Sequence, residues 1–486
     1  MRLSELLREV EFEGSIKNDS DIKFVTDDSR LVRPGALFVC IRHRSFDGHT
    51  AAAEALASGA AAVVTQERLG LENELNVADS RAAYARLCAA LCGHPERKLR
   101  MIGVTGTNGK TTVTTLIRNI LSDSGIKTLL TGTVCNRLGE ESLPSGLTTP
   151  KPPELYSLLS RAVLSGCEAC VAEASSQALA QGRLEGIAFD AAVFTNITRD
   201  HLDYHGTFEN YLAAKKKLFE HSEVSAVNLD DPRADEIIAA SSGKTVTFST
   251  VLDCADYTAK NISLLPEGVS FELVSKGRIE HINFASPGLF SVSNAMAAAV
   301  CAINLGVDPR SAAQSLARSK GVCGRLERVE CGTPYSVIID YAHTPDGLEQ
   351  VLRALRPSCR GKLIVLFGCG GDRDKTKRPL MGAAACKYAD TVIVTSDNPR
   401  SEEPMKIIGD ILKGTDKKRR GLFIEEDRRR ATALALSLAK PGDTVLLAGK
   451  GHEKYQLICG EKSPLDERET VREILGLPHD TGRKKP

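Results

Sequence analysis

Apolar residues recur along the chain in two patterns, one typical of buried strands and the other of helices. Residues 101–104 form a short apolar run. In the segment 110–124 that follows, the apolar residues have the spacing of one helix face, and Gly125 comes directly after the segment. The residues of that face are Val113, Leu116, Ile117, Ile120 and Leu121. The pattern predicts a strand, a glycine-rich turn and a helix that ends at Gly125.

The same patterns divide the chain into three regions. Residues 1–95 are predicted to form a small α/β unit, with a strand at 36–41 and a helix at 51–57. Residues 96–325 alternate strands and helices in the manner of a parallel sheet with covering helices. Residues 326–486 repeat this alternation. The chain is therefore predicted to be an α/β protein that ends in a doubly wound, Rossmann-like domain.

Four polar or glycine-rich segments of the third region each follow the end of a predicted strand. The strands are expected at 336–339, 362–367, 391–395 and 444–447. The segments that follow them are Asp340, residues 368–373, Asp397 and Gly449. Because ligands of open α/β sheets bind beyond the carboxyl ends of strands, the segments are predicted to form one site. Ordinary loop turns are the alternative.

Composition narrows the class of protein. The chain has 486 residues, of which 42% are hydrophobic and 26% charged, with a formal net charge of +1. The length predicts about three domains, and the near-zero charge does not favour nucleic acid as a partner. The 14 cysteines are scattered, which favours a reduced, cytoplasmic chain. The sequence has no pattern of a signal peptide, membrane span or zinc motif, so membrane insertion is not expected.

A glycine-rich loop lies between the predicted strand at 101–104 and the helix at 110–124. Its residues are Gly106, Thr107, Asn108, Gly109, Lys110, Thr111 and Thr112. Backbone N–H groups at the start of a helix hold phosphates, Lys110 is placed to reach the β and γ oxygens, and Thr111 is placed to bind magnesium. The loop predicts ATP and Mg²⁺ as ligands, although Val104 stands where a Walker A motif has its first glycine.

Three other side chains are candidates for metal binding or catalysis. Glu173 and His201 each follow a predicted apolar strand, where a carboxylate and an imidazole can support magnesium. They would otherwise be surface residues at strand ends. In the helix predicted at 209–220, Lys215 lies inside an apolar stripe. Burial would lower the pKa of its ammonium and leave a neutral amine able to react with carbon dioxide, whereas a lysine that snorkels to water would stay charged.

The glycine-rich loop, the segment 173–177 and the segment 195–205 occur in the order found in the Mur ligase superfamily, and the chain resembles that superfamily over nearly its whole length. The resemblance implies a UDP-binding amino-terminal domain, a P-loop central domain and a Rossmann-like carboxy-terminal domain. It also implies that Lys110, Lys215 and His201 are catalytic, with Glu173 and His201 supporting metal sites. A carbamylated Lys215 would be a further magnesium ligand.

Within the superfamily, the chain is similar to the members that add meso-diaminopimelate to UDP-N-acetylmuramoyl-L-alanyl-D-glutamate. The similarity assigns three sets of binding residues. Those for adenosine are Asn294, Arg325, Asp340 and His343. Those for the uridine diphosphate end are Ser29, His43, Arg44 and Ser45. Those for the muramoyl dipeptide are Thr148, Thr149, Ser175, Gln181 and Arg183.

The motif at residues 397–400 indicates which amino acid is added. Diaminopimelate differs from lysine by one extra carboxylate, and a planar guanidinium binds a carboxylate through two parallel hydrogen bonds. Arg400 suits that task, with Arg373 as a second candidate, and acidic or amide groups would hold the distal ammonium. The residues assigned to diaminopimelate are Arg373, Asp397, Asn398, Pro399, Arg400, Gly449 and Glu453.

The resemblance implies a monomeric ligase that forms an acyl phosphate on the D-glutamyl γ-carboxylate and transfers it to diaminopimelate. Its partners would be these small-molecule substrates. Three alternatives stay open. The first is a ligase that adds lysine, and the second is a folylpolyglutamate synthase. The third is a regulatory protein without ligase activity, because Gln177 stands where the family usually has histidine.

Overall fold

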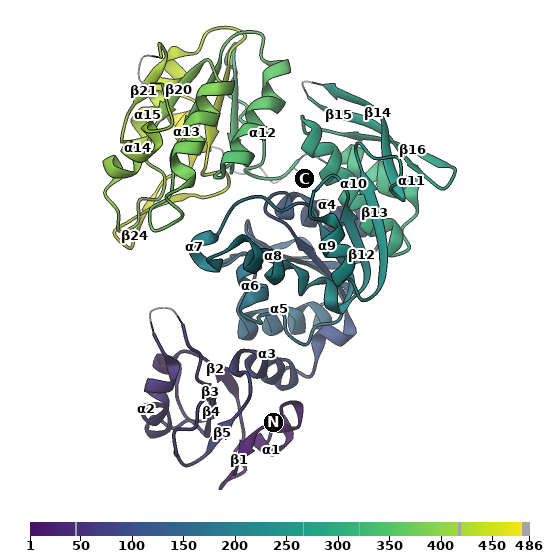
Figure 1. Ribbon diagram of the computed structural model, residues 1–486, viewed down its shortest axis with the longest axis vertical. Coiled ribbons are helices and arrows are strands. Elements are labelled where there is room, and N and C mark those ends of the chain that lie inside the picture. The colour runs from purple at the N-terminus through teal and green to yellow at the C-terminus, as the bar shows by residue number, and fades with distance from the viewer. Residues whose placement is uncertain (44–45, 266, 320, 417–418, 479–486) are drawn as a thin grey trace.

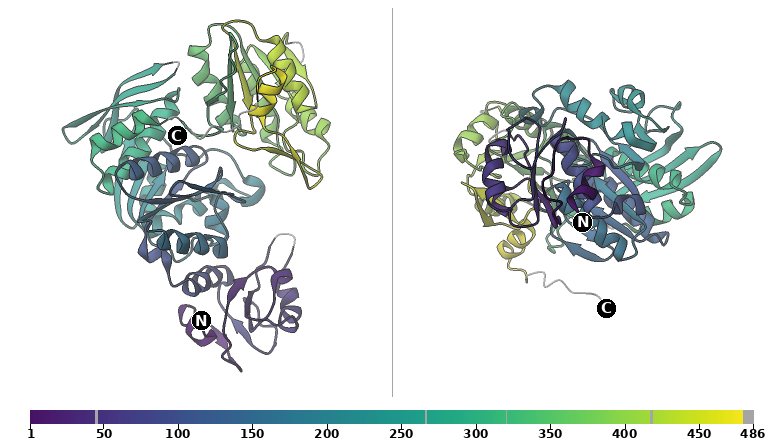
Figure 2. Two further views of the ribbon diagram at one scale, coloured as in Figure 1. Left: turned by 180° about the vertical axis from the view of Figure 1, so that it is seen from behind. Right: turned by 90° about the horizontal axis from the view of Figure 1, so that it is seen from below.

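Three β-sheets follow one another along the long axis of the molecule, from the amino-terminal end at the bottom of Figure 1 to the carboxy-terminal domain at the top. The same three bodies are distinct when the molecule is seen from behind (Figure 2). This computed structural model describes residues 1–43, 46–265, 267–319, 321–416 and 419–478. Arg44 and Ser45, from the predicted uridine diphosphate set, lie outside the described residues. The architecture is the three-domain α/β arrangement that the sequence predicts.

The amino-terminal sheet has the strand order β1-β5-β4-β3-β2 and is parallel except for β1. Its strands are β1 (Glu13–Gly14), β2 (Phe24–Thr26), β3 (Ala36–Val39), β4 (Ala62–Thr65) and β5 (Glu74–Asn76). Its helices are α1 (Leu3–Leu6), α2 (Ala52–Ala57) and α3 (Ser80–Leu91). The strand predicted at 36–41 and the helix predicted at 51–57 are confirmed as β3 and α2, each slightly shorter than expected. Helix α3 packs on α5 (Pro152–Leu164) of the central domain.

The central sheet has 11 strands in the order β16-β15-β14-β13-β12-β11-β6-β10-β7-β8-β9. They are β6 (Arg100–Thr105), β7 (Thr128–Thr131), β8 (Asn136–Leu138), β9 (Glu141–Leu143), β10 (Ala169–Glu173), β11 (Phe189–Phe194), β12 (Ser222–Asn228), β13 (Lys244–Ser249), β14 (Tyr257–Leu265), β15 (Gly268–Ser275) and β16 (Arg278–Phe284). The helices besides α5 are α4 (Lys110–Asp123), α6 (Ser176–Ala180), α7 (Leu202–His205), α8 (Phe208–Lys216), α9 (Ala234–Ala240), α10 (Leu289–Asn304) and α11 (Pro309–Arg318).

The expectation of a parallel central sheet is correct for its middle and wrong at both edges. Strands β8, β9, β15 and β16 pair antiparallel with their neighbours. Gly139, with φ of +55°, and Gly277, with φ of +79°, supply tight turns before β9 and β16. Such turns let consecutive strands pair directly, whereas parallel pairing needs a longer crossover. The edges are therefore built from local hairpins, and the parallel middle carries the loops of the candidate site.

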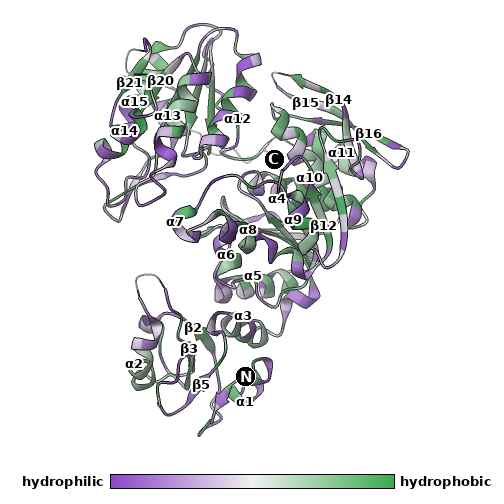
Figure 3. Cartoon of the chain, in the orientation of Figure 1, coloured by the Kyte–Doolittle hydropathy of each residue, from purple (hydrophilic) through white to green (hydrophobic). Residues whose placement is uncertain are grey.

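The carboxy-terminal sheet has the order β17-β18-β22-β19-β20-β21. Its strands are β17 (Glu327–Arg328), β18 (Ser336–Asp340), β19 (Leu363–Phe367), β20 (Thr391–Val394), β21 (Leu422–Ile424) and β22 (Thr444–Ala448), and a separate hairpin consists of β23 (Tyr455–Ile458) and β24 (Glu461–Pro464). The helices are α12 (Pro345–Leu355), α13 (Lys377–Tyr388), α14 (Pro404–Leu412), α15 (Arg428–Leu438) and α16 (Glu467–Ile474). All four predicted strands are confirmed. Apolar residues run along the strands (Figure 3), and helices cover them to close the core.

The four strand ends of the carboxy-terminal domain meet at one edge of the sheet, as predicted. Asp340, Gly449, Gly368 and Asp397 follow or end the adjacent parallel strands β18, β22, β19 and β20. A Cβ atom on Gly449 would lie only 2.5 Å from Asp397 Oδ2, so these loops pack in direct contact. The absence of a side chain at Gly449 is what permits that approach.

A buried ion pair holds two of these loops in place. Arg428 is 2% exposed and its Nε donates to Glu467 Oε1 at 2.9 Å, while Glu467 is 1% exposed. The Arg428 guanidinium also donates to Ser396 O at 3.2 Å and to Ala448 O at 2.7 Å. One guanidinium thus ties α15 and α16 to the ends of the loops that carry Asp397 and Gly449.

Replacing Arg428 by alanine is expected to lower the free energy of unfolding of the carboxy-terminal domain by about 3–5 kcal/mol, because Glu467 would be left as an unpaired buried carboxylate. Arg429→Ala is the matched control. Arg429 is exposed and pairs with Glu473 at the surface, so its loss should cost about 1 kcal/mol or less. Urea denaturation followed by circular dichroism measures both effects, and equal losses would contradict the role given to Arg428.

Candidate active site

The glycine-rich loop lies between β6 and α4, as predicted, and its backbone is held tightly. Gly109 precedes the first residue of α4 and has a φ of +88°, in the left-handed region that favours glycine. A Cβ atom on Gly109 would lie 2.5 Å from Asn294 Oδ1, and one on Gly106 would overlap Thr195 Oγ1. The glycines therefore serve both backbone conformation and close approach to neighbouring loops. The N–H groups of the first turn of α4 are available for an anion.

Lys110 folds back over the loop from the first residue of α4. Its Nζ donates to Gly106 O at 2.8 Å and to Thr107 O at 2.9 Å. Burial lowers the pKa of this ammonium. The Thr107 hydroxyl in turn shares a hydrogen bond of 2.9 Å with the Tyr211 hydroxyl of α8. The loop and α8 are thus connected directly.

Glu173, at the end of β10, lies beside the start of α4. The Thr111 hydroxyl donates to Glu173 Oε2 at 3.0 Å. Thr133 donates to the same carboxylate through its backbone N–H at 2.8 Å and its hydroxyl at 2.9 Å. Arg325, in the segment that leads into the carboxy-terminal domain, donates to Thr111 Oγ1 at 3.2 Å. The hydroxyl and the carboxylate predicted to bind magnesium are therefore neighbours in a buried place.

Lys215 is buried, with 1% of its side chain surface exposed. Its helix, predicted to span 209–220, ends at Lys216, and a separate 3₁₀ turn follows at Phe219–His221. The Nζ atom lies 4.6 Å from the centre of the Tyr211 ring and has neither a hydrogen bond nor an ion pair with any residue in the described part of the chain. Burial, aided by the nearby Lys110, lowers the pKa of Lys215 well below its ordinary value.

His201 precedes α7 in a left-handed conformation, with φ of 54°. Its ring lies 6.1 Å from that of Tyr211, and burial lowers its pKa to about 3. The neighbouring Asp200 is 4% exposed and faces Lys377 of α13, with 3.8 Å between Nζ and Oδ1. Among the residues that the structure describes, no cluster of three or more His, Cys, Asp and Glu side chains has the arrangement of a complete metal site.

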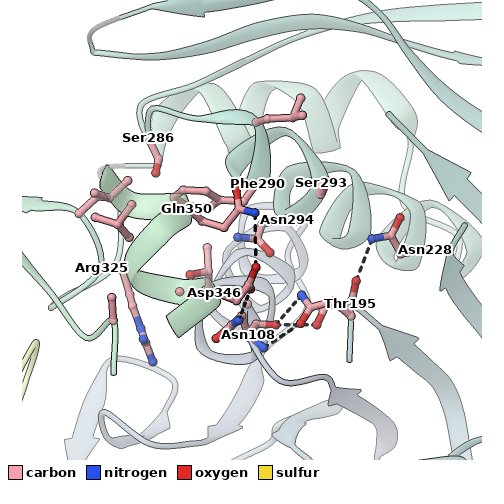
Figure 4. A pocket seen from close by; sticks show the side chains of 18 of the residues that line it. Asn108, Thr195, Asn228, Ser286, Phe290, Ser293, Asn294, Arg325, Asp346 and Gln350 are labelled. Carbon is pink, nitrogen blue, oxygen red and sulfur yellow. Dashed lines mark hydrogen bonds between the residues drawn. The ribbon is translucent and has the colours of Figure 1, made fainter. Parts of the chain in front are cut away.

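A cavity of about 440 Å³ lies between the central and carboxy-terminal domains, next to the glycine-rich loop (Figure 4). Asn108 crosses the junction and donates to Asp346 Oδ2 of α12 at 3.0 Å. All four residues predicted to hold adenosine line this cavity, as do three residues of the glycine-rich loop. They are Asn294, Arg325, Asp340 and His343, with Asn108, Gly109 and Thr112.

Asp340 and Arg325 shape the carboxy-terminal wall of the cavity. Each oxygen of the Asp340 carboxylate accepts one backbone N–H, from Ala342 at 2.7 Å and from Leu326 at 2.7 Å. A carboxylate oxygen has two acceptor positions, so Asp340 retains capacity for ribose hydroxyls. The Arg325 guanidinium lies 4.6 Å from the centre of the Tyr341 ring. Burial raises the pKa of Asp340 and lowers that of His343 to about 4, so the imidazole is uncharged near neutrality.

The residues predicted to hold the muramoyl dipeptide form a second hydrogen-bonded cluster. Arg183 donates to Thr149 O at 2.7 Å and to Gln181 Oε1 at 2.7 and 2.9 Å. The Thr149 hydroxyl lies 3.1 Å from Ser175 Oγ, and the Thr148 and Thr133 hydroxyl oxygens lie 3.1 Å apart. This cluster is connected to the Glu173 region through Thr133.

Ser29 and His43, from the uridine diphosphate set, lie in the amino-terminal domain. His43 is exposed and lies 3.6 Å from Asp27 Oδ2. Asp27 also accepts from Lys151, which precedes α5, at 3.0 Å. The Asp27 carboxylate thus connects the amino-terminal and central domains.

The predicted amino-acid motif at 397–400 follows β20. Arg400 is half-buried with φ of 53°, and its Nη1 donates to Gly371 O at 2.7 Å. Its backbone pairs with Ile458 of β23, which fixes the position of the side chain. Burial, aided by Arg373, lowers the pKa of Arg400. Arg373 itself is exposed and donates to Asp372 O at 3.2 Å.

Sequence reasoning missed Lys450, which lies between two of the predicted diaminopimelate residues. Its side chain is 0% exposed, and its Nζ donates to Asn398 Oδ1 at 2.6 Å and to Glu453 Oε2 at 2.8 Å. The only sign of this role in the sequence is that Lys450 stands in a glycine-rich loop after a strand. Lysines in such loops are usually exposed, so the sequence does not indicate that Lys450 is buried. The contact with Asn398 spans 52 residues and is visible only in the fold.

Three profiles of Mur ligase domains match the chain in order. They are the Mur ligase family catalytic domain at 21–89, the Mur ligase middle domain at 104–302 and the Mur ligase glutamate ligase domain at 324–451. A Syntrophomonas wolfei protein named UDP-N-acetylmuramoyl-L-alanyl-D-glutamate–2,6-diaminopimelate ligase is 42% identical over 487 residues, covering 98% of this chain and 99% of that relative. The chain belongs to the Mur ligase family.

Other members of the Mur ligase family match at similar extent. A Clostridium tetani protein of the same name is 41% identical over 488 residues, covering 98% of this chain and 99% of that relative. A solved structure with that name has a TM-score of 0.70 and 34% identity, covering 98% of this chain and 99% of its own. The fold alone is shared with the Thermotoga maritima MurF ligase in complex with ADP, at a TM-score of 0.62, 19% identity, and coverage of 93% and 96%.

Gly109→Ala is expected to weaken ATP binding at least about 10-fold, because the added methyl group would displace Asn294 from the cavity wall. Gly125→Ala is the matched control. It has nearly the same φ of +86° at the other end of α4, but its Cβ would meet nothing within 4 Å, so it should cost about 1 kcal/mol of stability without changing affinity. Titration with a fluorescent ATP analogue measures both, and equal losses of affinity would count against the cavity as the nucleotide site.

Proposed function

We infer that the chain is an ATP-dependent ligase of peptidoglycan precursor synthesis that joins 2,6-diaminopimelate to UDP-N-acetylmuramoyl-L-alanyl-D-glutamate. The observation that carries this inference is the position of the 397–400 motif, at the same sheet edge as Asp340 of the cavity wall. Relatives whose names state this activity match nearly the whole chain at 41–42% identity. We propose the meso isomer as the amino acid, as the resemblance of the motifs implies.

The reaction has two steps. The γ-carboxylate of the glutamyl residue attacks the γ-phosphate of ATP, which gives an acyl phosphate and ADP. The amine of diaminopimelate then attacks the acyl carbon, so that a C–N bond forms as the C–O bond to phosphate breaks, and phosphate and a proton leave. Both steps develop negative charge on phosphoryl oxygens. Lys110 and the N–H groups at the start of α4 are placed to stabilise that charge.

Thr111 and Glu173 fit a magnesium ion. Hydroxyl and carboxylate oxygens are the ligands that Mg²⁺ prefers, and these two lie 3.0 Å apart beside the phosphate loop. When bound, Mg²⁺ offsets negative charge on the phosphoryl oxygens. We propose that His201 and Lys215, which both lie near the Tyr211 ring, would support a second metal ion.

Lys215 is proposed to act as a carbamate. A neutral amine attacks carbon dioxide, a C–N bond forms, and one proton is released, which leaves a carboxylate at the end of the side chain. The depressed pKa and the lack of a carboxylate partner in the described part of the chain support this chemistry, because both favour the uncharged amine. The carbamate would add one oxygen ligand for Mg²⁺.

The domain limits and cellular setting are proposals as well. We propose domains at 1–95, 96–325 and 326–486, because the three sheets span Glu13 to Asn76, Arg100 to Phe284 and Glu327 to Ala448. We propose a monomer, as the resemblance to the Mur ligase superfamily implies. The 14 cysteines are free thiols, as expected in the reducing cytoplasm. No helix in the described part of the chain has the length and apolar character needed to cross a membrane.

Phosphate release with the UDP-muramoyl dipeptide, ATP and a panel of amino acids tests the function. Release is expected with diaminopimelate and not with lysine at equal concentration. Arg400→Ala should raise the KM for diaminopimelate about 10–100-fold, because a charge-assisted double hydrogen bond is lost, and leave the KM for ATP unchanged.

Arg373→Ala is the comparison for Arg400→Ala. Because Arg373 is exposed, its loss should raise the KM for diaminopimelate less. Release with lysine but not diaminopimelate would replace the proposed substrate by that of the lysine-adding ligases. No release with any amino acid would favour the regulatory protein.

Lys215→Met is expected to lower ligase activity about 100-fold or more while leaving the free energy of unfolding unchanged or raised. The substitution removes a potential metal ligand, but it also removes a buried amine that has no charged partner among the described residues. Lys216→Met, one residue further along α8 and only half-buried, is the control and should retain activity. Phosphate release measures the activity of each variant, and thermal unfolding measures its stability. A strongly destabilised Lys215→Met protein would contradict the proposal.

A further inference from the structure

Lys450 places a fixed positive charge inside the predicted amino-acid site. Its ammonium donates to Asn398 Oδ1 and Glu453 Oε2, lies 3.8 Å from Asp397 Oδ1, and is 0% exposed. We propose that Lys450 is a positioning residue that determines specificity for diaminopimelate over lysine, by setting the hydrogen-bond pattern and the net charge of this pocket. The proposal rests on the proposed function.

The contacts of Lys450 decide which way the Asn398 amide faces. Asn398 Oδ1 accepts from Lys450 Nζ at 2.6 Å and from the backbone N–H of Leu457 at 2.9 Å. Both partners can only donate, so the atom between them must be the amide oxygen. Its two acceptor positions are then occupied. Asn398 Nδ2 donates to Glu453 Oε2 at 2.9 Å and retains a second hydrogen, so Asn398 offers a ligand a donor rather than an acceptor.

This pattern changes the role expected for Asn398. A ligand ammonium needs acceptors, and those that remain are the carboxylate oxygens of Asp397 and Glu453 Oε1. Neither group forms a further side-chain hydrogen bond through these oxygens with the residues that the structure describes. A ligand carboxylate needs donors, which Arg400 and the second hydrogen of Asn398 Nδ2 provide. The pocket therefore has separate places for an ammonium and a carboxylate.

The charges of the pocket sum to zero because Lys450 is there. Asp397 and Glu453 are negative, while Lys450 and Arg400 are positive. The neighbouring residues Asp372 and Arg373 together add no net charge, and neither does the ion pair of Arg428 with Glu467. The distal centre of diaminopimelate carries an ammonium and a carboxylate and is also neutral, whereas lysine ends in an ammonium alone. Without Lys450 the pocket would carry one excess negative charge and would favour lysine.

The test compares kcat/KM for diaminopimelate and lysine in the full-length enzyme, with the KM for ATP measured alongside. If the turnover of lysine is too slow to measure, its affinity is obtained from its inhibition of the diaminopimelate reaction. Lys450→Met should reduce the diaminopimelate-to-lysine preference about 10-fold or more and leave the KM for ATP within about 2-fold. Lys454→Met, at an exposed lysine of the same segment, should keep the wild-type preference.

A charge-compensating variant separates specificity from folding. Lys450→Met combined with Glu453→Gln removes both partners of the buried pair, which proteins tolerate better than the loss of one. Its pocket is neutral again, so the preference for diaminopimelate should move back toward that of the wild type even if overall activity is lower. An equal loss of both substrates in Lys450→Met, or no recovery in the double variant, would overturn the proposal. If the wild-type enzyme itself does not use diaminopimelate, the proposed function fails instead.

Discussion

Parallel pairing of β6 with β10 on one side and with β11 on the other is the constraint on which the active site depends. Val104 pairs with Glu173, and Thr105 pairs with Phe194. The three strands therefore end at the same edge of the sheet. The residues that follow or end them there are the glycine-rich loop, Glu173 and the segment that carries His201. The backbone hydrogen bonds between these central strands fix the relative positions of the strand ends. The side chains that follow the strands are therefore brought together by the sheet itself.

Local pattern predicted the parts of the fold that depend on local spacing. The helix expected at 110–124 is α4 at Lys110–Asp123, and the four strands of the carboxy-terminal domain occur where expected. The helix expected at 209–220 ends at Lys216, and a separate 3₁₀ turn that contains Phe219 follows it. Phe219 is buried in this turn as it would be in a longer helix, so the apolar spacing did not distinguish the two structures. The antiparallel edges of the central sheet were missed because strand pattern does not reveal the direction of pairing.

The sequence predicted which residues lie together where a motif follows a strand, and it did not predict residues that meet across the fold. The adenosine set lines one cavity, and the 397–400 motif reaches the same sheet edge as Asp340. Lys450 was not predicted because its role depends on its contact with Asn398, which follows a different strand. Three buried basic side chains differ in their partners. Arg428 has a carboxylate partner, Lys450 is shared between a carboxylate and an amide, and Lys215 has no charged partner within the described residues.

One hydrogen bond, from Asn108 to Asp346, joins the glycine-rich loop to the carboxy-terminal domain, and a second, from Arg325 to Thr111, joins α4 to the segment that leads into that domain. The cavity predicted to hold the nucleotide thus has walls from two domains. If the domains exchange between arrangements, only the fraction with both walls in contact binds fully, and the measured dissociation constant is the intrinsic constant divided by that fraction. Loss of the Asn108–Asp346 contact would therefore weaken ATP binding, although Asp346 is not among the residues assigned to adenosine.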